Sequence, residues 1–394
     1  MKPFSSRGAW LALALSIAAT DVFAVPAFAR RYEVACSFCH QVFPKLNRIG
    51  ERFKERGFRL QNEDKFDGSA WIKHAPISGR LEGTRNLPEG GPGRNIGYFK
   101  VLSAGNLGTK LSYWVDDAWL RAGGDTIHIK PDNAWVRVDL APLGRFYGKV
   151  GRFELDLPVT QTRTPHLLPY PIYGTNTGLE TDGIGRYQEG MELGGEFGTT
   201  RISASLVKGR NNQAVVDLSK STGVGDPGKF DGNVFLRVSR RLESSRFGAF
   251  AYVGRNQLVA RISATRLGVA KDNIVRLGID GNVRVKKLNV YGVALYGSNS
   301  NSVLSASQPS GTGEPLGFAG GFLAGDYHLG DGVALTARVQ TRSVDLAGAS
   351  DRASLTSFLP GVQIVIWKVK LSGQVNFSNN NVKRFSSLQV ETAF

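Results

Sequence analysis

Five consecutive residues, Cys36-Ser37-Phe38-Cys39-His40, carry the clearest chemistry in the sequence. Two thiols spaced three residues apart can add to the two vinyl groups of a porphyrin, and the adjacent imidazole then lies under the iron as an axial ligand. The spacing therefore predicts one covalently bound haem c, attached through Cys36 and Cys39, with His40 as the ligand of the haem iron.

Two other functions of a C-x-x-C pair are possible, a redox-active dithiol and half of a zinc site. A zinc site needs further ligands at matching spacing, and the chain has 2 cysteines in all. A thioredoxin-like dithiol needs a βαβ context, which the flanking sequence does not provide. Haem attachment is the interpretation that remains.

The second axial ligand of such a haem is usually methionine or histidine. His74 is the first candidate, because it lies just before Pro76, where the N-terminal region ends and the strand pattern begins. Met191 is the second candidate, because it opens a predicted strand that could face inward. An open or water-ligated position is the alternative to both.

The first 24 residues have the layout of a secretory signal peptide. A basic start with Lys2 and Arg7 precedes an apolar run over 9–19, and small residues follow up to Ala24. The mature chain is therefore expected to work outside the cytoplasm. The formal charge of +16 favours anionic partners, but export and the lack of a binding motif argue against nucleic acid.

Residues 25–76 are predicted to form a small α-helical plug that holds the haem. Within it, the stretch 43–57 predicts a short helix, with Pro44 in its first turn and Leu46, Ile49 and Phe53 at helical spacing. Gly57 is a natural stop. A domain of about fifty residues buries little surface, so the rest of the chain must help enclose the cofactor.

From residue 77 to 394 the pattern changes to alternation of apolar and polar residues. Stretches such as 333–342 and 367–377 place cationic side chains on one face only. About sixteen such segments are separated by Gly, Asn, Asp and Ser clusters, and the chain ends on Phe394. These features favour an all-β fold, an outer-membrane β-barrel of about sixteen strands in contact with lipid, over a soluble β-sandwich.

The predicted inward face of this barrel is rich in cations, which should favour anions over Fe²⁺. They are Arg137, Lys149, Arg237, Arg338, Arg342, Lys368 and Lys370. A long, proline-containing connection, 155–187, interrupts the strands, and connections of this length are often functional. Folding of this connection into the lumen is one possibility that the sequence leaves open.

The N-terminal motifs carry a resemblance to a known family. The segments 25–30, 36–40, 44–47 and 53–58, followed by a barrel ending in Phe, resemble the fused monohaem cytochrome c–porin family of outer-membrane iron-oxidising cytochromes. The resemblance implies a haem plug in a barrel of the bacterial outer membrane. It also implies Fe(II) as the extracellular electron donor and a periplasmic c-type cytochrome or similar carrier as the acceptor.

Two other functions stay open at this point. One is an anion-selective porin whose haem plug senses redox state, and the other is a conduit that carries electrons outward. If the protein acts as an enzyme, it is an Fe(II):cytochrome c oxidoreductase.

The attachment itself is directly testable. The denatured protein should retain one haem per chain on a gel, because thioether bonds survive unfolding. The double variant Cys36→Ala/Cys39→Ala should lose the haem stain. A stained double variant would contradict covalent attachment.

Overall fold

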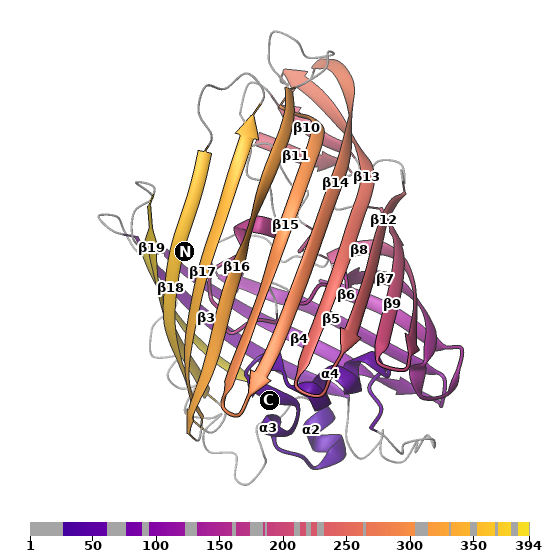
Figure 1. Cartoon of the computed structure of the whole chain (residues 1–394), viewed down its shortest axis with the longest axis vertical. Coiled ribbons are helices and arrows are strands. Elements are labelled where there is room, and N and C mark those ends of the chain that lie inside the picture. The colour runs from indigo at the N-terminus through magenta and orange to yellow at the C-terminus, as the bar shows by residue number, and fades with distance from the viewer. Residues whose placement is uncertain are drawn as a thin grey trace, which may run out of the picture.

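The computed structural model covers the whole chain and describes most of it (Figure 1). The described residues are 27–60, 76–88, 94–122, 132–159, 163–173, 184–185, 187–208, 213–217, 222–226, 232–262, 265–303, 314–330, 332–346, 353–366, 369–379 and 385–393. The predicted signal peptide, His74, Lys368 and Phe394 lie outside this set.

The described residues form long antiparallel strands that follow the alternating stretches of the sequence. The first seven are β3 (Ile77–Pro88), β4 (Arg94–Leu107), β5 (Leu111–Ala122), β6 (Asn133–Asp139), β7 (Phe146–Glu154), β8 (Tyr187–Phe197) and β9 (Thr200–Val207). The remainder are β10 (Gln213–Asp217), β11 (Thr222–Asp226), β12 (Asn233–Arg241), β13 (Ser245–Ile262), β14 (Thr265–Val285), β15 (Leu288–Val303), β16 (Glu314–Gly330), β17 (Val333–Leu346), β18 (Ala353–Ile366), β19 (Val369–Ser378) and β20 (Phe385–Ala393).

The sheet closes on itself. The last strand, β20, pairs with the first barrel strand, β3, from Phe385↔Pro88 to Ala393↔Arg80. Strand β9 pairs directly with β12, so the barrel closes without the β10–β11 hairpin that lies between them in sequence. Strand β10 of this hairpin pairs in parallel with β13. Sixteen of the described strands thus form a closed antiparallel barrel. In lipid, closure is required because an open edge would leave backbone groups without hydrogen-bond partners. The predicted all-β barrel of about sixteen strands is confirmed.

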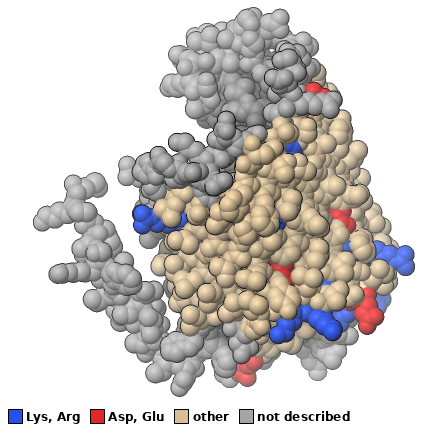
Figure 2. Space-filling view, turned by 60° about the vertical axis from the view of Figure 1, so that its left-hand side comes forward, with Lys and Arg blue, Asp and Glu red and all other residues tan. Residues whose placement is uncertain are grey.

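The two faces of each strand differ as the alternation predicted. In β9, Arg201, Ser203 and Ser205 are buried inside the barrel, whereas Ile202 and Leu206 are exposed on its outer face. Figure 2 shows the visible wall with few charged side chains, most of which lie toward the lower edge. The outer face is therefore an apolar band suited to contact with lipid.

The two ends of the barrel differ in the length of their connections. Short turns join β4 to β5, β8 to β9, β14 to β15 and β16 to β17, whereas most connections at the other end are longer, the two-residue link between β13 and β14 excepted. The helices of the N-terminal region lie at the short-turn end (Figure 1). In bacterial outer-membrane barrels the short turns face the periplasm, so this N-terminal plug lies at the periplasmic mouth.

The plug contains α2 (Ala27–Tyr32), α3 (Cys36–Cys39) and α4 (Arg48–Glu55), with a small hairpin of β1 (His40–Val42) and β2 (Lys45–Leu46). The predicted helix over 43–57 is correct in place but begins too early. Asn47 caps α4 by accepting hydrogen bonds from the amides of Ile49 and Gly50, whereas Pro44 lies in the turn of the hairpin. None of the described helices has the length and apolar character needed to cross a bilayer.

A buried ion pair stabilises the wall of the lumen. The Arg237 guanidinium on β12 donates two hydrogen bonds to the Asp280 carboxylate on β14, at 2.8 and 2.9 Å. Both side chains are almost fully buried. Removing one partner leaves the other charge buried without compensation, whereas replacing both by apolar groups does not.

Arg237→Met should therefore lower the free energy of unfolding by about 3–5 kcal/mol. Guanidinium unfolding in detergent micelles, followed by tryptophan fluorescence, measures this loss. The control is Arg237→Met/Asp280→Leu, which should recover most of the stability. Equal stabilities of the single variant and the wild type would contradict this role of the pair.

Candidate functional site

The two cysteines and the histidine of the predicted attachment motif line one pocket at the periplasmic mouth. The single turn of α3 places Cys36 and Cys39 on one side, as expected for residues three apart on a helix. Neither cysteine forms a disulfide, and both are half-buried. Burial raises the pKa of both thiols, and the neighbouring Cys36 raises that of Cys39 further.

His40 is oriented by the loop that follows it. Its Nδ1 lies 3.0 Å from the carbonyl oxygen of Pro44. A carbonyl can only accept, so Nδ1 carries the proton and Nε2 keeps the lone pair that can bind a metal. Burial lowers the pKa of His40 to about 4, and the Pro44 carbonyl partly opposes this shift. The imidazole is therefore neutral at pH 7, the form that ligates iron.

The plug and the barrel each supply one apolar wall of the pocket. The rings of Phe28 and Phe58 of the plug lie tilted to each other with centroids 4.8 Å apart, and Phe58 lies 5.5 Å from Trp114 of β5. The pocket is partly open to solvent. A largely apolar pocket with a few polar groups suits a flat macrocycle such as haem.

Four cations also line the pocket, and they suit the two carboxylates of a haem. They are Lys54, Arg80, Lys100 and Arg163. The last three form ion pairs with Glu391, Asp132 and Glu154 at 2.8–2.9 Å.

Lys54 differs from the other three, because its ammonium makes no hydrogen bond or ion pair with the described part of the chain. Burial and the nearby Arg163 together lower the pKa of Lys54 to about 8, although Glu154 and Asp156 act in the opposite direction. An anion beside Lys54 would relieve both effects. The thiols, the imidazole, the apolar walls and Lys54 together fit a haem.

The structure separates Met191 from this pocket. Met191 is 53% exposed on the outer face of β8, whereas the next residue, Glu192, is buried in the lumen and pairs with Lys149. Because strand side chains alternate, Met191 cannot point inward in this register. The expectation that Met191 faces the lumen is therefore wrong, and it is no distal ligand here. His74 lies outside the described residues and stays a prediction.

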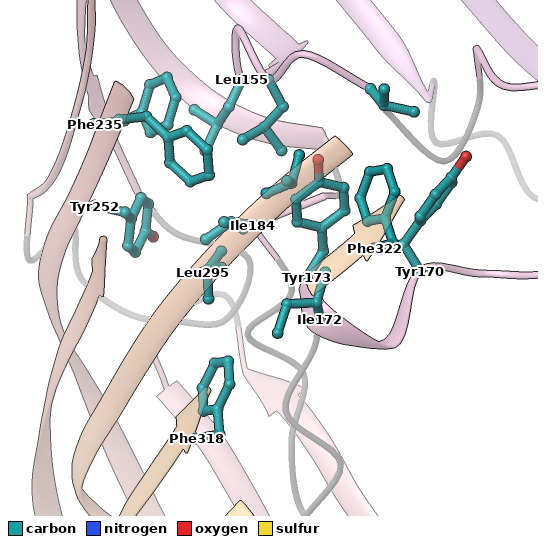
Figure 3. Packing of buried hydrophobic residues seen from close by; sticks show 14 of the residues in the cluster. Leu155, Tyr170, Ile172, Tyr173, Ile184, Phe235, Tyr252, Leu295, Phe318 and Phe322 are labelled. Carbon is teal, nitrogen blue, oxygen red and sulfur yellow. The ribbon is translucent and has the colours of Figure 1, made fainter. Parts of the chain in front are cut away.

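The connection after β7 folds into the lumen. Its described residues, Leu155–Val159, Arg163–Tyr173 and 184–185, form what we call the inserted segment. Figure 3 shows Leu155, Ile172 and Tyr173 packed against the inner wall at Phe235, Leu295 and Phe322. The upper lumen of the described barrel therefore contains an apolar core rather than only polar wall.

Three barrel side chains anchor the inserted segment. The side-chain oxygen of Gln374 accepts hydrogen bonds from the amides of Leu167 and Leu168, both at 3.1 Å. Arg338 donates to the carbonyl oxygens of Leu168 and Pro169, at 3.1 and 2.9 Å. Arg342 donates to the carbonyl of Pro171 at 3.2 Å. The segment also brings Arg163 to the wall of the cysteine pocket, so it belongs to both sites.

The inward-facing cations that sequence analysis identified are largely compensated. Arg137 pairs with Asp139, Lys149 with Glu192, Arg237 with Asp280, and Lys370 with Glu391. Arg338 and Arg342 instead donate hydrogen bonds to carbonyl oxygens of the inserted segment. The carboxylates of Glu192 and Glu391 come from the adjacent strand, Asp280 lies two strands away from Arg237, and Asp139 follows Arg137 on the same strand. Alternation within one strand gives no signal of the partners on other strands.

Among the described residues, no group of three or more His, Cys, Asp or Glu side chains is placed to hold a metal ion.

No protein-family model and no curated protein matches the chain. Solved structures of outer-membrane porins do match it. OmpT of Vibrio cholerae in its trimer form has a TM-score of 0.56 at 11% identity, over 81% of this chain and 98% of OmpT. The anion-selective porin of Comamonas acidovorans has a TM-score of 0.54 at 12% identity, over 81% and 98%.

Salmonella typhi OmpF in complex with daunomycin has a TM-score of 0.55 at 10% identity, over 81% of this chain and 97% of OmpF. At this level of identity the likeness is one of fold. Together with the closed sixteen-stranded barrel, it places the protein in the bacterial outer membrane as a porin-like barrel.

The anchoring of the inserted segment gives a prediction. Gln374→Leu removes the acceptor of two buried amides, worth about 2 kcal/mol in total. The population with a detached segment should therefore rise about thirtyfold. Hydrogen–deuterium exchange of the Leu167 and Leu168 amides measures this population.

The matched control is Gln363→Leu on the adjacent strand β18. Gln363 donates to the carbonyl of Phe43 in the plug at 2.6 Å and does not anchor the segment. Its loss should leave exchange at Leu167 and Leu168 unchanged. Equal protection in Gln374→Leu and the wild type would argue against the anchoring role.

Proposed function

We propose that this protein is an outer-membrane electron-transfer cytochrome with one covalently bound haem c. In this proposal it oxidises extracellular Fe(II) and passes the electrons to a periplasmic c-type cytochrome or a similar carrier. The observation that carries the proposal is the convergence of Cys36, Cys39 and His40 on one pocket, with the imidazole already oriented by Pro44.

The chain's own residues have defined tasks in this proposal. Cys36 and Cys39 form the thioether bonds, and His40 offers Nε2 to the iron while Pro44 fixes the ring. Lys54 neutralises a propionate, and the aromatic walls limit access of water. When bound, haem supplies a one-electron Fe(III)/Fe(II) couple whose potential depends on its ligands and burial.

The overall reaction needs neither a nucleophile nor a proton. One external Fe(II) loses one electron and becomes Fe(III), and one periplasmic acceptor gains that electron. The position of the plug at the periplasmic mouth supports the second half of this exchange, because a periplasmic carrier can approach the plug without entering the barrel.

Carboxylates beside four of the inward cations weaken the repulsion that the lumen would exert on a cationic donor, whereas Arg338 and Arg342 keep their charge. A row of uncompensated arginines and lysines would repel Fe²⁺. Four of the inward cations are instead paired with carboxylates, as are Arg80 and Lys100 in the pocket. Local pairing supports the iron hypothesis over an anion-selective lumen.

Two other functions remain candidates. An anion-selective porin with a redox-sensing plug is consistent with the porin fold, but the inserted segment packed in the lumen counts against a wide pore. A conduit that reduces an external acceptor would use the same pocket in the opposite direction.

Stopped-flow mixing separates the three functions. Fe(II) should reduce the oxidised protein, seen as a change in the haem spectrum, faster than Fe(III) oxidises the reduced protein. Cys36→Ala/Cys39→Ala should show no such change. A faster reaction in the Fe(III) direction would favour the outward conduit.

Planar-bilayer recording is the complementary measurement. We expect small currents that are insensitive to redox state. Large anion currents together with no reduction by Fe(II) would favour the porin and contradict the proposal.

A further inference from the structure

Two large apolar side chains are exposed on the periplasmic side of the plug. Phe38 is 38% exposed and Ile49 is 41% exposed. Asn47 ties their elements together, because its side chain donates to the carbonyl oxygens of Ser37 and Phe38, at 3.2 and 2.9 Å, while it caps α4. The two apolar groups therefore belong to one rigid surface.

This surface is bordered by two arginines that form no ion pair with any described residue, although Glu196 is near enough to raise the pKa of Arg52. Arg48 and Arg52 lie four residues apart on α4 and are both exposed. The hydrogen bond that Arg48 makes at 3.1 Å goes to the backbone carbonyl of Glu243, which leaves its charge in place. Burial lowers the pKa of Arg52, and Arg241, Arg56 and Arg48 lower it further, as expected for a cluster of like charges.

The turns around the plug continue the positive charge. Their exposed ionisable residues are mostly cations, namely Lys110, Arg145, Arg240, Lys286 and Lys287, and the exposed acids among the described residues of this end are Glu33 and Glu243. An apolar centre with a cationic border is complementary to a protein with an acidic border. Such charge complementarity increases the rate of encounter more than the lifetime of the complex.

The position of Phe38 connects this surface to the proposed chemistry. Phe38 lies between Cys36 and Cys39 and also lines the cysteine pocket, so the most exposed aromatic group among the described plug residues adjoins both proposed attachment points. Brief redox encounters use small interfaces, below roughly 1,200 Å².

We propose that Phe38, Ile49, Arg48 and Arg52 form the docking site for an acidic periplasmic electron-transfer protein. The inference rests on the proposed function and adds to it the location of the exit surface and the charge of the partner. A lipid surface is the competing occupant. The position of these residues on the plug, inside the ring of turns, favours a protein.

The test measures electron transfer from the reduced, haem-loaded protein to two soluble probes. Plant plastocyanin is an acidic acceptor, and mitochondrial cytochrome c is a basic one. Arg48→Glu/Arg52→Glu should lower the second-order rate constant with plastocyanin at least tenfold and weaken its dependence on salt. The same variant should raise the rate with cytochrome c.

Two controls accompany this variant. Lys208→Glu/Arg255→Glu makes the same change in net charge just after β9 and on β13, away from the plug, and both rates should stay within about twofold. Ile49→Ser, at a residue that does not line the cysteine pocket, should lower the rate with plastocyanin while keeping the dependence on salt, because it removes contact area rather than charge.

The outcomes are distinguishable. A haem-loaded protein that cannot be reduced or oxidised even by dithionite and ferricyanide would contradict the proposed function itself. Normal reaction with these reagents, but equal plastocyanin rates for the wild type and Arg48→Glu/Arg52→Glu, would overturn the docking site alone. Such equal rates with reduced binding to phosphatidylglycerol vesicles would assign the arginines to lipid.

Discussion

Ion pairs between the plug and the barrel wall maintain the geometry on which the candidate site depends. They join Lys45 to Asp326, Arg59 to Asp139, Glu51 to Arg284, and Glu55 to both Arg241 and Arg246. A plug of about fifty residues cannot enclose a large cofactor alone. Because these pairs fix it in the mouth, Leu102 and Trp114 of the barrel can complete a pocket that begins with Cys36 and His40.

Ion pairs and hydrogen bonds to buried arginines and lysines also explain how a strongly basic chain maintains a packed lumen. A buried charge is costly unless a partner lies beside it, and these inward arginines and lysines obtain partners from other strands or from the inserted segment. The backbone of the segment in turn forms hydrogen bonds with the side chains of Gln374 and Arg338, and its apolar side chains cover apolar residues of the wall. Lumen, segment and plug are therefore one connected structure.

This arrangement distinguishes the molecule from an open channel of the same fold. The porins that it resembles share the barrel, and likeness at 10–12% identity extends to the fold alone. What is particular to this chain lies at its periplasmic mouth. There an oriented histidine, two cysteines outside any disulfide and the Lys54 ammonium converge on a pocket beneath a cationic surface.

The sequence by itself determined the features that depend on residues close together along the chain. The attachment motif follows from the spacing of Cys36, Cys39 and His40, and the barrel follows from alternation, because side chains of a strand point to opposite faces. The tertiary structure decided the rest. The outward direction of Met191 depends on strand register, and the start of α4 depends on the cap by Asn47. The ion pairs of the lumen and the insertion of 155–173 join residues far apart in the chain, and only closure of the barrel brings such residues within contact distance.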